Sequence, residues 1–374
     1  MPQTLAAADD PMFGLFRVMR DDDSLDPAHV FDDALLVRIY REMKRLRALD
    51  ERMLTIQRQG RIGFYGESKG QEATPIATGF ALEKDDWVFP ALREGAVMLV
   101  RGFPLDQFVA QCFGNSCDVL KGRQMPSHYS GRAVNQVAWS SCIGPQVPQA
   151  VGCAWAMKLQ HTKHVALGFM GDGATSQPDV HNALNFAGVF KVPCVMICQN
   201  NHWAISVPSA KQTASPTFAS KAIAYGIPGV RVDGNDVLAV LVVLREAIAR
   251  ARAGDGATFV ESVTYRMGAH SSSDDPTRYR TDEEVAAWAK KDPVDRMRRV
   301  LIKRGLLDDA REQRMFAEVD AEVKEAIAKV ETAAMPARET VFDDVFSTLP
   351  WHLEEQRREM LKHPPPAGHG AAGH

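Results

Sequence analysis

Hydrophobic and polar positions follow two different periods along the chain. Apolar residues recur at helical spacing over 34–60, while arginine and lysine fill the opposite face, which predicts an amphipathic helix. Gly60 is expected to end it, since glycine readily adopts the left-handed conformation that follows a helix. Shorter helices are predicted over 104–113 and 147–159.

The centre of the chain alternates short apolar runs with helical patterns. Strands are predicted over 164–170, 192–200, 230–234 and 257–265, and helices over 178–190 and 236–252. Strands that alternate with helices favour a parallel sheet with right-handed crossovers. The expected fold class is therefore α/β, with a central, mainly parallel sheet and helices on both of its faces.

The two ends of the chain differ from this centre. Residues 1–33 are acidic and mixed in character, and we expect an extended N-terminal arm there. Residues 282–361 are predicted to be mostly helical, so that an α/β domain over 34–350 carries a C-terminal helical extension. Over 351–374 we expect a helix and then a disordered, low-complexity tail.

Composition and charge exclude several classes of protein. The net charge is −3 and the pI about 6.4, so the basic footprint of a nucleic-acid-binding protein is missing. No apolar run approaches the roughly 20 residues of a membrane-spanning helix. The six cysteines form no Cys-x-x-Cys pair, which favours reduced thiols. The first residues resemble neither a secretory signal nor a transit peptide, so we expect a cytoplasmic protein of a bacterium.

One predicted strand runs directly into Gly-Asp-Gly at 171–173. In an open parallel sheet, ligands bind beyond the carboxyl ends of the strands. Asp172 follows one strand and the pair Asn200 and Asn201 follows the next. Carboxylate and amide oxygens suit Mg²⁺, which completes its octahedron with water and substrate phosphates. The sequence therefore predicts a magnesium ion between Asp172 and a phosphate group.

A nicotinamide-binding loop is the alternative interpretation of the same glycines. It is disfavoured because Ser176 stands where the third glycine of G-x-G-x-x-G is needed. The next strand also ends on Gln199 and not on an acidic residue. The chain contains no G-x-x-x-x-G-K-[ST], which excludes a P-loop nucleotide triphosphatase.

A wider resemblance surrounds this motif. Gly-Asp-Gly, 26 intervening residues and then Asn-Asn is the thiamine diphosphate signature. The stretches that carry the resemblance are KGRQMPSHY (121–129), PQVPQAVG (145–152), GDGATSQPDVHNALNFA (171–187), NNHWAIS (200–206), YGIPGVRVDGNDVLAV (225–240) and YRMGAHSSSDDPTRYR (265–280). Over roughly 35–350 the chain resembles the alpha subunit of the thiamine diphosphate-dependent, decarboxylating component of 2-oxo acid dehydrogenase complexes.

Within this family the sequence is more similar to the branched-chain (2-oxoisovalerate) enzymes than to the pyruvate enzymes. Pyruvate-type subunits usually carry a glycine-rich GGSMH where this chain has GRQMPSH. The resemblance implies the thiamine diphosphate-binding fold. It also implies oxidative decarboxylation of substrates such as 3-methyl-2-oxobutanoate, with transfer of the acyl group to the lipoyl carrier of an acyltransferase component. A pyruvate or acetoin dehydrogenase alpha subunit, or a non-catalytic paralogue, remains an alternative.

The resemblance also implies which residues form the site. Asp172, Asn201 and the backbone carbonyl of Trp203 are the expected Mg²⁺ ligands. The expected contacts to thiamine diphosphate are Arg93, Ser141, Ile143, Gly171, Asp172, Gly173, Ala174, Asn201 and His270. Arg93 corresponds to an arginine that clamps a phosphate oxygen, and the backbone amides of Gly171, Gly173 and Ala174 are expected at the start of the following helix, where they can meet the diphosphate.

His270 is the expected catalytic residue, because a histidine titrates near working pH and can donate a proton to a developing oxyanion. Phe64 and Tyr65 correspond to a segment near the substrate side chain, although a core role fits them equally well. His128 is expected to be structural.

The chain departs from the family pattern in several places. Leu92 replaces a common tyrosine, and Gln199 replaces an arginine often found before the asparagine pair in branched-chain enzymes. Pro145 removes a hydroxyl from a potassium site of some relatives, so no potassium is predicted. Ser271 corresponds to a serine that is phosphorylated in some relatives.

One catalytic group is missing altogether. The cofactor needs a glutamate bonded to its aminopyrimidine ring, supplied by a second α/β domain, and the sequence contains no such domain. We therefore expect half a site, completed by a beta subunit in an assembly of two alpha and two beta chains.

Overall fold

The structure is a computed structural model that describes residues 14–363. Five parallel strands form one sheet in the order β1-β2-β3-β7-β6. Their bounds are Trp87–Phe89 (β1), Ala166–Gly171 (β2), Cys194–Asn200 (β3), Gly229–Asp233 (β6) and Thr258–Val263 (β7). The predicted parallel α/β sheet is thus confirmed, and each strand predicted in the centre of the chain is present.

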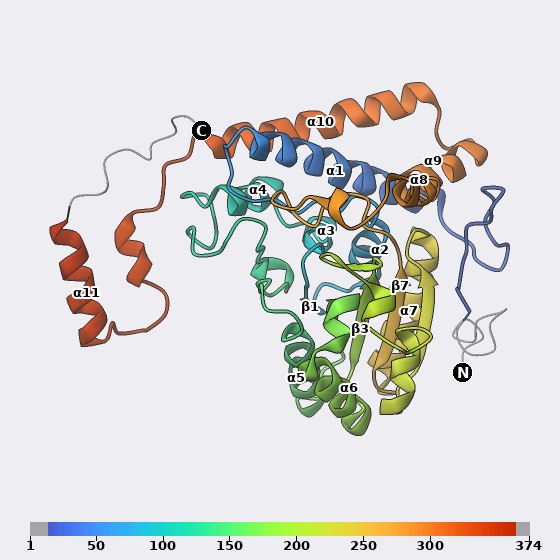
Figure 1. Cartoon of the computed structure of the whole chain (residues 1–374), viewed down its shortest axis with the longest axis horizontal. Helices are drawn as coiled ribbons and strands as arrows, with labels where there is room; N and C mark the ends of the chain where they lie inside the picture. Colours follow the sequence, from blue (N-terminus) through green and yellow to red (C-terminus); the bar gives the residue numbers. More distant parts are fainter. Residues whose placement is uncertain (1–13, 364–374) are drawn as a thin grey trace.

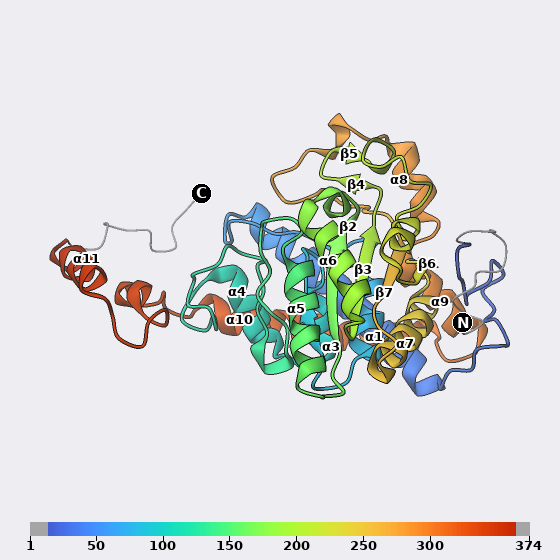
Figure 2. The ribbon, with the colours of Figure 1, turned by 90° about the horizontal axis from the view of Figure 1, so that it is seen from below.

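Helices cover both faces of this sheet and extend beyond it (Figures 1 and 2). Their bounds are Asp33–Arg58 (α1), Ala73–Ala81 (α2), Gly95–Val100 (α3), Leu105–Phe113 (α4), Gln146–Leu159 (α5), Pro178–Phe190 (α6), Val237–Ala253 (α7), Asp282–Ala289 (α8), Pro293–Lys303 (α9), Asp309–Glu331 (α10) and Trp351–Lys362 (α11). A two-stranded antiparallel hairpin, β4 (Trp203–Ala204) with β5 (Val207–Pro208), follows β3 directly.

The alternation of side chains along β2 shows how the layers are built. Leu167 and Phe169 pack into the cluster that contains α2 and α7, whereas Ala166 and Met170 pack into the cluster that contains α5 and α6. Successive side chains of a strand point to opposite faces, and a sheet buried on both faces can therefore be apolar throughout. All four of these residues are fully buried, so β2 is a rigid support for the loop that follows it.

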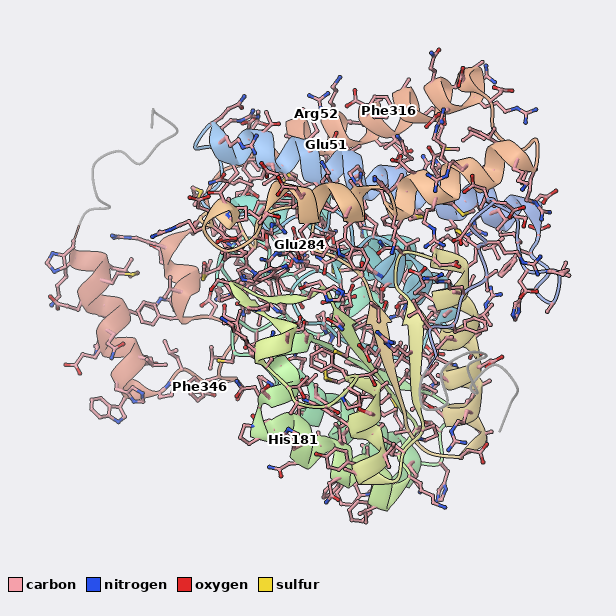
Figure 3. All side chains as sticks on the ribbon, turned by 45° about the vertical axis from the view of Figure 1, so that its right-hand side comes forward. Glu51, Arg52, His181, Glu284, Phe316 and Phe346 are labelled. Atoms are coloured by element: carbon pink, nitrogen blue, oxygen red, sulfur yellow. The ribbon has the colours of Figure 1, made fainter. Side chains whose placement is uncertain are left out.

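Helices α1 and α10 form an outer layer and lie side by side (Figure 1). Arg52 on α1, labelled in Figure 3, pairs with Asp320 on α10 at 2.8 Å. Buried residues of α10 such as Val323 and Ile327 join the cluster that contains Leu49 and Met53 of α1.

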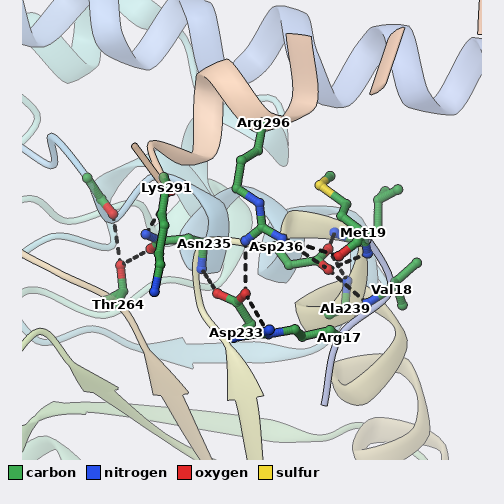
Figure 4. Close-up of polar contacts among 12 residues, drawn as sticks. Arg17, Val18, Met19, Asp233, Asn235, Asp236, Ala239, Thr264, Lys291 and Arg296 are labelled. Carbon is green, nitrogen blue, oxygen red and sulfur yellow. Dashed lines mark hydrogen bonds and ion pairs between the residues drawn. The ribbon is translucent and has the colours of Figure 1, made fainter. Parts of the chain in front are cut away.

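Part of the N-terminal segment, from Phe16 to Met19, lies against the β6 edge of the sheet and the start of α7, and Arg17, Val18 and Met19 are labelled in Figure 4. The Phe16 N–H donates to the Arg231 carbonyl, and the Asp233 N–H donates to the Phe16 carbonyl, each at 3.0 Å. The buried carboxylate of Asp236 accepts the N–H groups of Val18 and Met19 at 2.8 and 2.6 Å. The segment therefore covers an edge strand that would otherwise be open to pairing with another chain. Residues 1–13 of the predicted arm lie outside the described residues.

The C-terminal part is mostly helical over 282–361, as the sequence predicts, because α8, α9, α10 and α11 occupy most of this range. The stretch from Thr332 to Pro350 interrupts the helices and contains only a short 3₁₀ helix, Arg338–Phe342. Pro336 stands shortly after the end of α10, and proline disfavours helical conformation in the residue before it. Residues 335–363 form a projecting arm that ends in α11 and extends away from the body (Figure 1). The tail over 364–374 lies outside the described residues.

Candidate active site

The carboxyl ends of β2 and β3 meet at one rim of the sheet. Gly171 is paired with Gln199 in the parallel ladder, so Asp172 and Asn200 follow side by side. The Ser209 hydroxyl lies 3.0 Å from Asp172 Oδ2 and 3.3 Å from Asn200 Oδ1. The hairpin β4–β5 and α8 cover this end of the sheet (Figure 2). The acid and the asparagine pair thus share one rim, as the sequence predicts.

Asp172 is held from the side by polar residues that sequence reasoning missed. Its carboxylate is 1% exposed, and Gln212 Nε2 donates to its Oδ2 at 2.7 Å, beside the Ser209 hydroxyl. Burial raises the pKa of Asp172 above its usual value. No short motif identifies Ser209 and Gln212, since both come from the loop after β5.

Gly173 is required by close packing and not by an unusual backbone angle. A Cβ atom at this position would lie 2.5 Å from Cβ of Ala204, which a real side chain does not tolerate. The hairpin can therefore lie against the loop after β2 only when residue 173 is glycine.

Asn201 is fixed by a partner on another part of the chain. Its Nδ2 donates to Gln71 Oε1 at 2.9 Å, and its Oδ1 accepts the N–H of Trp203 at 3.1 Å. Gln71 Nε2 is buried and has no hydrogen-bond partner among the described residues. The contact with Gln71 thus orients the Asn201 side chain so that its amide oxygen points toward the Trp203 backbone.

The carbonyl of Trp203, the third expected metal ligand, faces a cation. Arg266 donates from Nη1 to this carbonyl at 3.2 Å, and the Arg266 side chain is fully buried. Within residues 14–363 no group of three or more His, Cys, Asp or Glu side chains could hold a metal. The expected magnesium set contains one carboxylate, one amide and one carbonyl, and Mg²⁺ needs only one or two protein carboxylates when phosphate completes its shell. The donor chemistry of the rim therefore fits a phosphate-bound magnesium ion.

Two buried guanidinium groups and an imidazole converge near this rim. Arg93 is 5% exposed and donates to the backbone carbonyls of Glu67 and His270, the second at 2.6 Å. Neither Arg93 nor Arg266 forms an ion pair with a carboxylate anywhere in the described chain. Buried charges without a counterion are costly, so this arrangement is typical of a site that binds an anion.

The pKa values of Arg93 and His270 show the effect of burial and of the neighbouring positive charges. Burial lowers the pKa of Arg93 to about 10, and the neighbouring Arg266 adds to the effect. Burial lowers the pKa of His270 to about 4, with further contributions from Arg93 and Arg266. His270 is thus neutral at physiological pH in the absence of an anion. An anion placed among the three groups favours all three charged forms.

The backbone after β2 differs from the expectation in one detail. Residues Asp172–Ser176 form a 3₁₀ turn, and the α-helix begins only at Pro178. Gly173 and Ala174 therefore lie in this turn and not at the start of α6, while Gly171 ends β2. The reason is that proline favours the first position of a helix, where no N–H is needed. The first N–H groups of the turn have no acceptor within it and remain available to a ligand.

Ser141 and Ile143 lie on an open loop. Ile143 is 55% exposed, and Ser141 is exposed as well. The Ser141 hydroxyl is hydrogen-bonded to His128 Nε2 at 2.6 Å, and the His128 ring packs on Trp139 with 3.6 Å between ring centroids. His128 thus contacts a predicted cofactor residue, and its structural role stays a prediction. A loop contact of this kind leaves no periodic signal in the sequence.

The segment expected near the substrate, Phe64 and Tyr65, is joined to the loop that follows His270. The Tyr65 N–H donates to Ser272 Oγ at 3.1 Å, and the Ser272 N–H donates to the Tyr65 carbonyl at 2.9 Å. The Tyr65 side chain is 2% exposed, lies in the core and donates its hydroxyl to Asp50 at 2.8 Å. Phe64 is half-buried, and its role at the substrate stays a prediction.

The fold and the site together define an α/β cofactor-binding protein with an anion site at the ends of parallel strands. The family model described as "Dehydrogenase E1 component" matches residues 40–339. The chain therefore belongs to the dehydrogenase E1 component family, which implies thiamine diphosphate as cofactor and, for an alpha subunit, a beta subunit as partner.

Several curated relatives are similar over most of their length. The chain is 44% identical to 3-methyl-2-oxobutanoate dehydrogenase subunit alpha of Mycobacterium tuberculosis, over 87% of this chain and 86% of the relative. It is 40% identical to 2-oxoisovalerate dehydrogenase subunit alpha 1 of Arabidopsis thaliana, over 94% and 76%. It is 38% identical to the human 2-oxoisovalerate dehydrogenase subunit alpha, over 93% and 79%. Among the described residues, none of the helices has the length and apolar character needed to span a bilayer.

Proposed function

We propose that this chain is the alpha subunit of a branched-chain 2-oxo acid dehydrogenase that decarboxylates substrates of the 3-methyl-2-oxobutanoate class and transfers the acyl group to a lipoyl carrier. The observation that carries the proposal is the cluster of the buried Arg93, the buried Arg266 and the half-buried His270, whose side chains form no ion pair with a carboxylate among the described residues. This cluster lies near the rim of Asp172 and Asn201. A diphosphate would pair with the cationic cluster, and a divalent cation bound to it would be held by Asp172 and Asn201.

The side chains of the rim would hold the cofactor and the metal. Asp172, Asn201 and the Trp203 carbonyl would bind Mg²⁺, while Arg93 and the N–H groups of Gly173 and Ala174 would bind the diphosphate. Gly171 would lie beside it at the end of β2. Ser141 and Ile143 would contact the aminopyrimidine. Thiamine diphosphate, when bound, supplies a nucleophilic carbon that attacks the keto group and takes up the electrons released with carbon dioxide.

His270 would move protons at the substrate. Its pKa of about 4 without an anion keeps the imidazole neutral, so it can donate a hydrogen bond to an oxygen that gains charge. A bound diphosphate raises this pKa and allows the protonated form to contribute as well. The carbonyl of His270 is anchored by Arg93, and its N–H donates to Asp274 Oδ2 at 2.7 Å. The backbone of His270 is therefore held at both its carbonyl and its N–H, which fixes the start of the loop.

The site requires a second chain. Residues 14–363 contain a single parallel sheet, so the domain that would supply the glutamate for the aminopyrimidine is not within them. The exposed loop of Ser141 and Ile143 is a surface that a partner can cover. We propose a beta subunit in an assembly of two alpha and two beta chains, a lipoyl-bearing acyltransferase as the acceptor, and a location in the bacterial cytoplasm.

One assay tests the proposed function. The chain and its beta subunit are co-expressed, and turnover with a reduced-lipoyl readout is measured on 3-methyl-2-oxobutanoate, pyruvate and acetoin. We expect the branched substrate to have the highest kcat/KM and the chain alone to have no activity. A tenfold preference for pyruvate, about 1.4 kcal/mol of transition-state stabilisation, would contradict the substrate class. Full turnover by the chain alone would contradict the need for a beta subunit.

A further inference from the structure

A buried hydrogen bond joins the turn that carries Arg93 to the strand that leads into Asn201. Glu94 is 2% exposed and Gln199 is 3% exposed. Gln199 donates from Nε2 to Glu94 Oε1. Glu94 follows β1 in the chain, whereas Gln199 belongs to β3, and β2 lies between these strands in the sheet. The hydrogen bond therefore spans the end of β2, where the Gly-Asp-Gly loop begins.

The second oxygen of Glu94 fixes the turn itself. Its Oε2 accepts the N–H of Ala91 at 2.7 Å and the N–H of Arg93 at 3.1 Å. The backbone of Arg93 is thus held by the carboxylate of the next residue, while its guanidinium is held by the carbonyls of Glu67 and His270. A shift of the Glu94 side chain would move the Arg93 backbone with it.

Gln199 holds the other side. It is the last but one residue of β3, is paired with Gly171 of β2 and Ser262 of β7, and directly precedes the asparagine pair. The Glu94–Gln199 hydrogen bond therefore connects the turn that carries Arg93, expected to bind phosphate, to the end of β3 that carries Asn201, expected to bind the metal.

Stability alone explains this pair poorly. Gln199 Oε1 is buried and lacks a hydrogen-bond partner among the described residues, and an unsatisfied buried acceptor costs about 1–3 kcal/mol. Burial also raises the pKa of Glu94 to about 7, so its charged form is disfavoured where it stands. Two apolar side chains of similar size would avoid both costs, but the N–H groups of Ala91 and Arg93 would then lose their acceptor. The contacts of the pair therefore indicate a role in the geometry of the turn.

We propose that Glu94 and Gln199 are positioning residues that set the separation between Arg93 and the metal-binding loop, so that binding of the diphosphate depends on their hydrogen bond. This inference rests on the proposed function. Glu94 and Gln199 would fix the distance between Arg93 and the metal-binding loop without touching the cofactor.

The test measures cofactor affinity and not turnover. The co-expressed alpha and beta chains are freed of cofactor, and thiamine diphosphate with Mg²⁺ is titrated by calorimetry. Gln199→Met keeps the length of the side chain but removes the hydrogen bond, and we expect the Kd to rise at least tenfold. Gln136→Met is the matched control: Gln136 is 2% exposed and donates to the Glu94 backbone carbonyl at 3.4 Å, but it does not touch the Glu94 carboxylate. This control should change the Kd less than twofold, although it should lower the melting temperature about as much as Gln199→Met does.

Exchanging the two side chains separates an effect on geometry from a loss of stability. Gln199→Glu alone places two carboxyl groups against each other, and the Kd should rise at least tenfold. Adding Glu94→Gln restores the bond in the opposite direction, because the new amide oxygen can accept both backbone N–H groups while its nitrogen donates to the new carboxylate. The double variant should bind within threefold of the original pair.

The outcomes distinguish the two proposals. If the unaltered complex does not bind thiamine diphosphate, the proposed function is wrong. If the unaltered complex binds it but Gln199→Met binds equally well, or if the double variant is as weak as Gln199→Glu, the positioning role is wrong.

Discussion

Single residues determine the charge of the site, and the main feature is an excess of buried positive groups. Arg93 and Arg266 are both within the core, and each donates to carbonyl or hydroxyl oxygens and to no carboxylate among the described residues. Buried guanidinium groups that form no ion pair are costly, and a bound anion would stabilise both of them.

The titration of His270 gives a direct prediction. Its pKa of about 4 should rise when the diphosphate binds, because an adjacent anion favours the protonated imidazole. The measurement is NMR of ¹³C-labelled histidine in the alpha–beta complex, with and without thiamine diphosphate, and His270→Asn identifies the signal. A pKa that does not change on binding would place the diphosphate elsewhere.

Asp172→Asn tests the metal side of the site. The variant keeps the shape of the side chain but removes the negative charge, so Mg²⁺-dependent binding of thiamine diphosphate should weaken at least a hundredfold. Because burial raises the pKa of Asp172, the neutral variant should melt at the same or a higher temperature than the original protein. The exposed Asp179 on α6 provides the control, since Asp179→Asn should leave the affinity unchanged. Undiminished binding by Asp172→Asn contradicts the metal assignment.

At the scale of elements, sequence patterns predicted those parts of the fold that are buried on regular faces. The strands around Leu167 and Ile197 and the helix that begins at Pro178 are present where periodicity places them, because burial dictates their apolar positions. Contacts between loops could not be predicted in this way. His128 on Ser141 and Gln212 on Asp172 depend on the tertiary arrangement of irregular segments, which leave no period in the sequence.

The start of α7 illustrates how one element is fixed by another. Asp236 caps this helix through the N–H groups of Leu238 and Ala239, and it also accepts those of Val18 and Met19 from the N-terminal segment (Figure 4). Four backbone donors therefore depend on one buried carboxylate.

We expect Asp236→Asn to lower the free energy of unfolding by about 2 kcal/mol, because one oxygen is replaced by a nitrogen that cannot accept these bonds. The control is Asp308→Asn at the exposed start of α10, where the side chain accepts the Arg311 N–H and forms an exposed ion pair with the Arg311 guanidinium, and the loss should be below about 1 kcal/mol. Denaturant unfolding of both variants measures the difference. Equal losses at the two sites would show that the N-terminal segment adds nothing to the cap.

At the scale of the whole molecule, the projecting arm is the part that lacks a core. No residue of α11 is buried, and Phe346 on the arm, labelled in Figure 3, is 52% exposed. Trp351 is 75% exposed. Ion pairs of Lys121 and Arg123 with Asp344 connect the arm to the body. A helix of this length is marginal on its own in water, so another chain is expected to cover it.

Removal of residues 335–374 should therefore reduce co-purification of the beta subunit at least tenfold, while the helical content of the remaining chain stays as expected for its length. Removal of residues 364–374 alone is the control and should leave co-purification unchanged. Circular dichroism and the ratio of the two chains after affinity purification provide the readouts. Full co-purification after the longer deletion would exclude the arm from the subunit contact.

The most direct test of the account is to locate the metal. The alpha–beta complex is crystallised with thiamine diphosphate and Mn²⁺ in place of Mg²⁺, and the anomalous signal of manganese identifies the ion. We predict one peak at the rim, with oxygens of Asp172 and Asn201 at about 2.0–2.2 Å as expected for an octahedral ion of this class, and with diphosphate oxygens completing its shell. A cofactor bound with its diphosphate away from Arg93, or a manganese peak that touches neither Asp172 nor Asn201, would contradict the account.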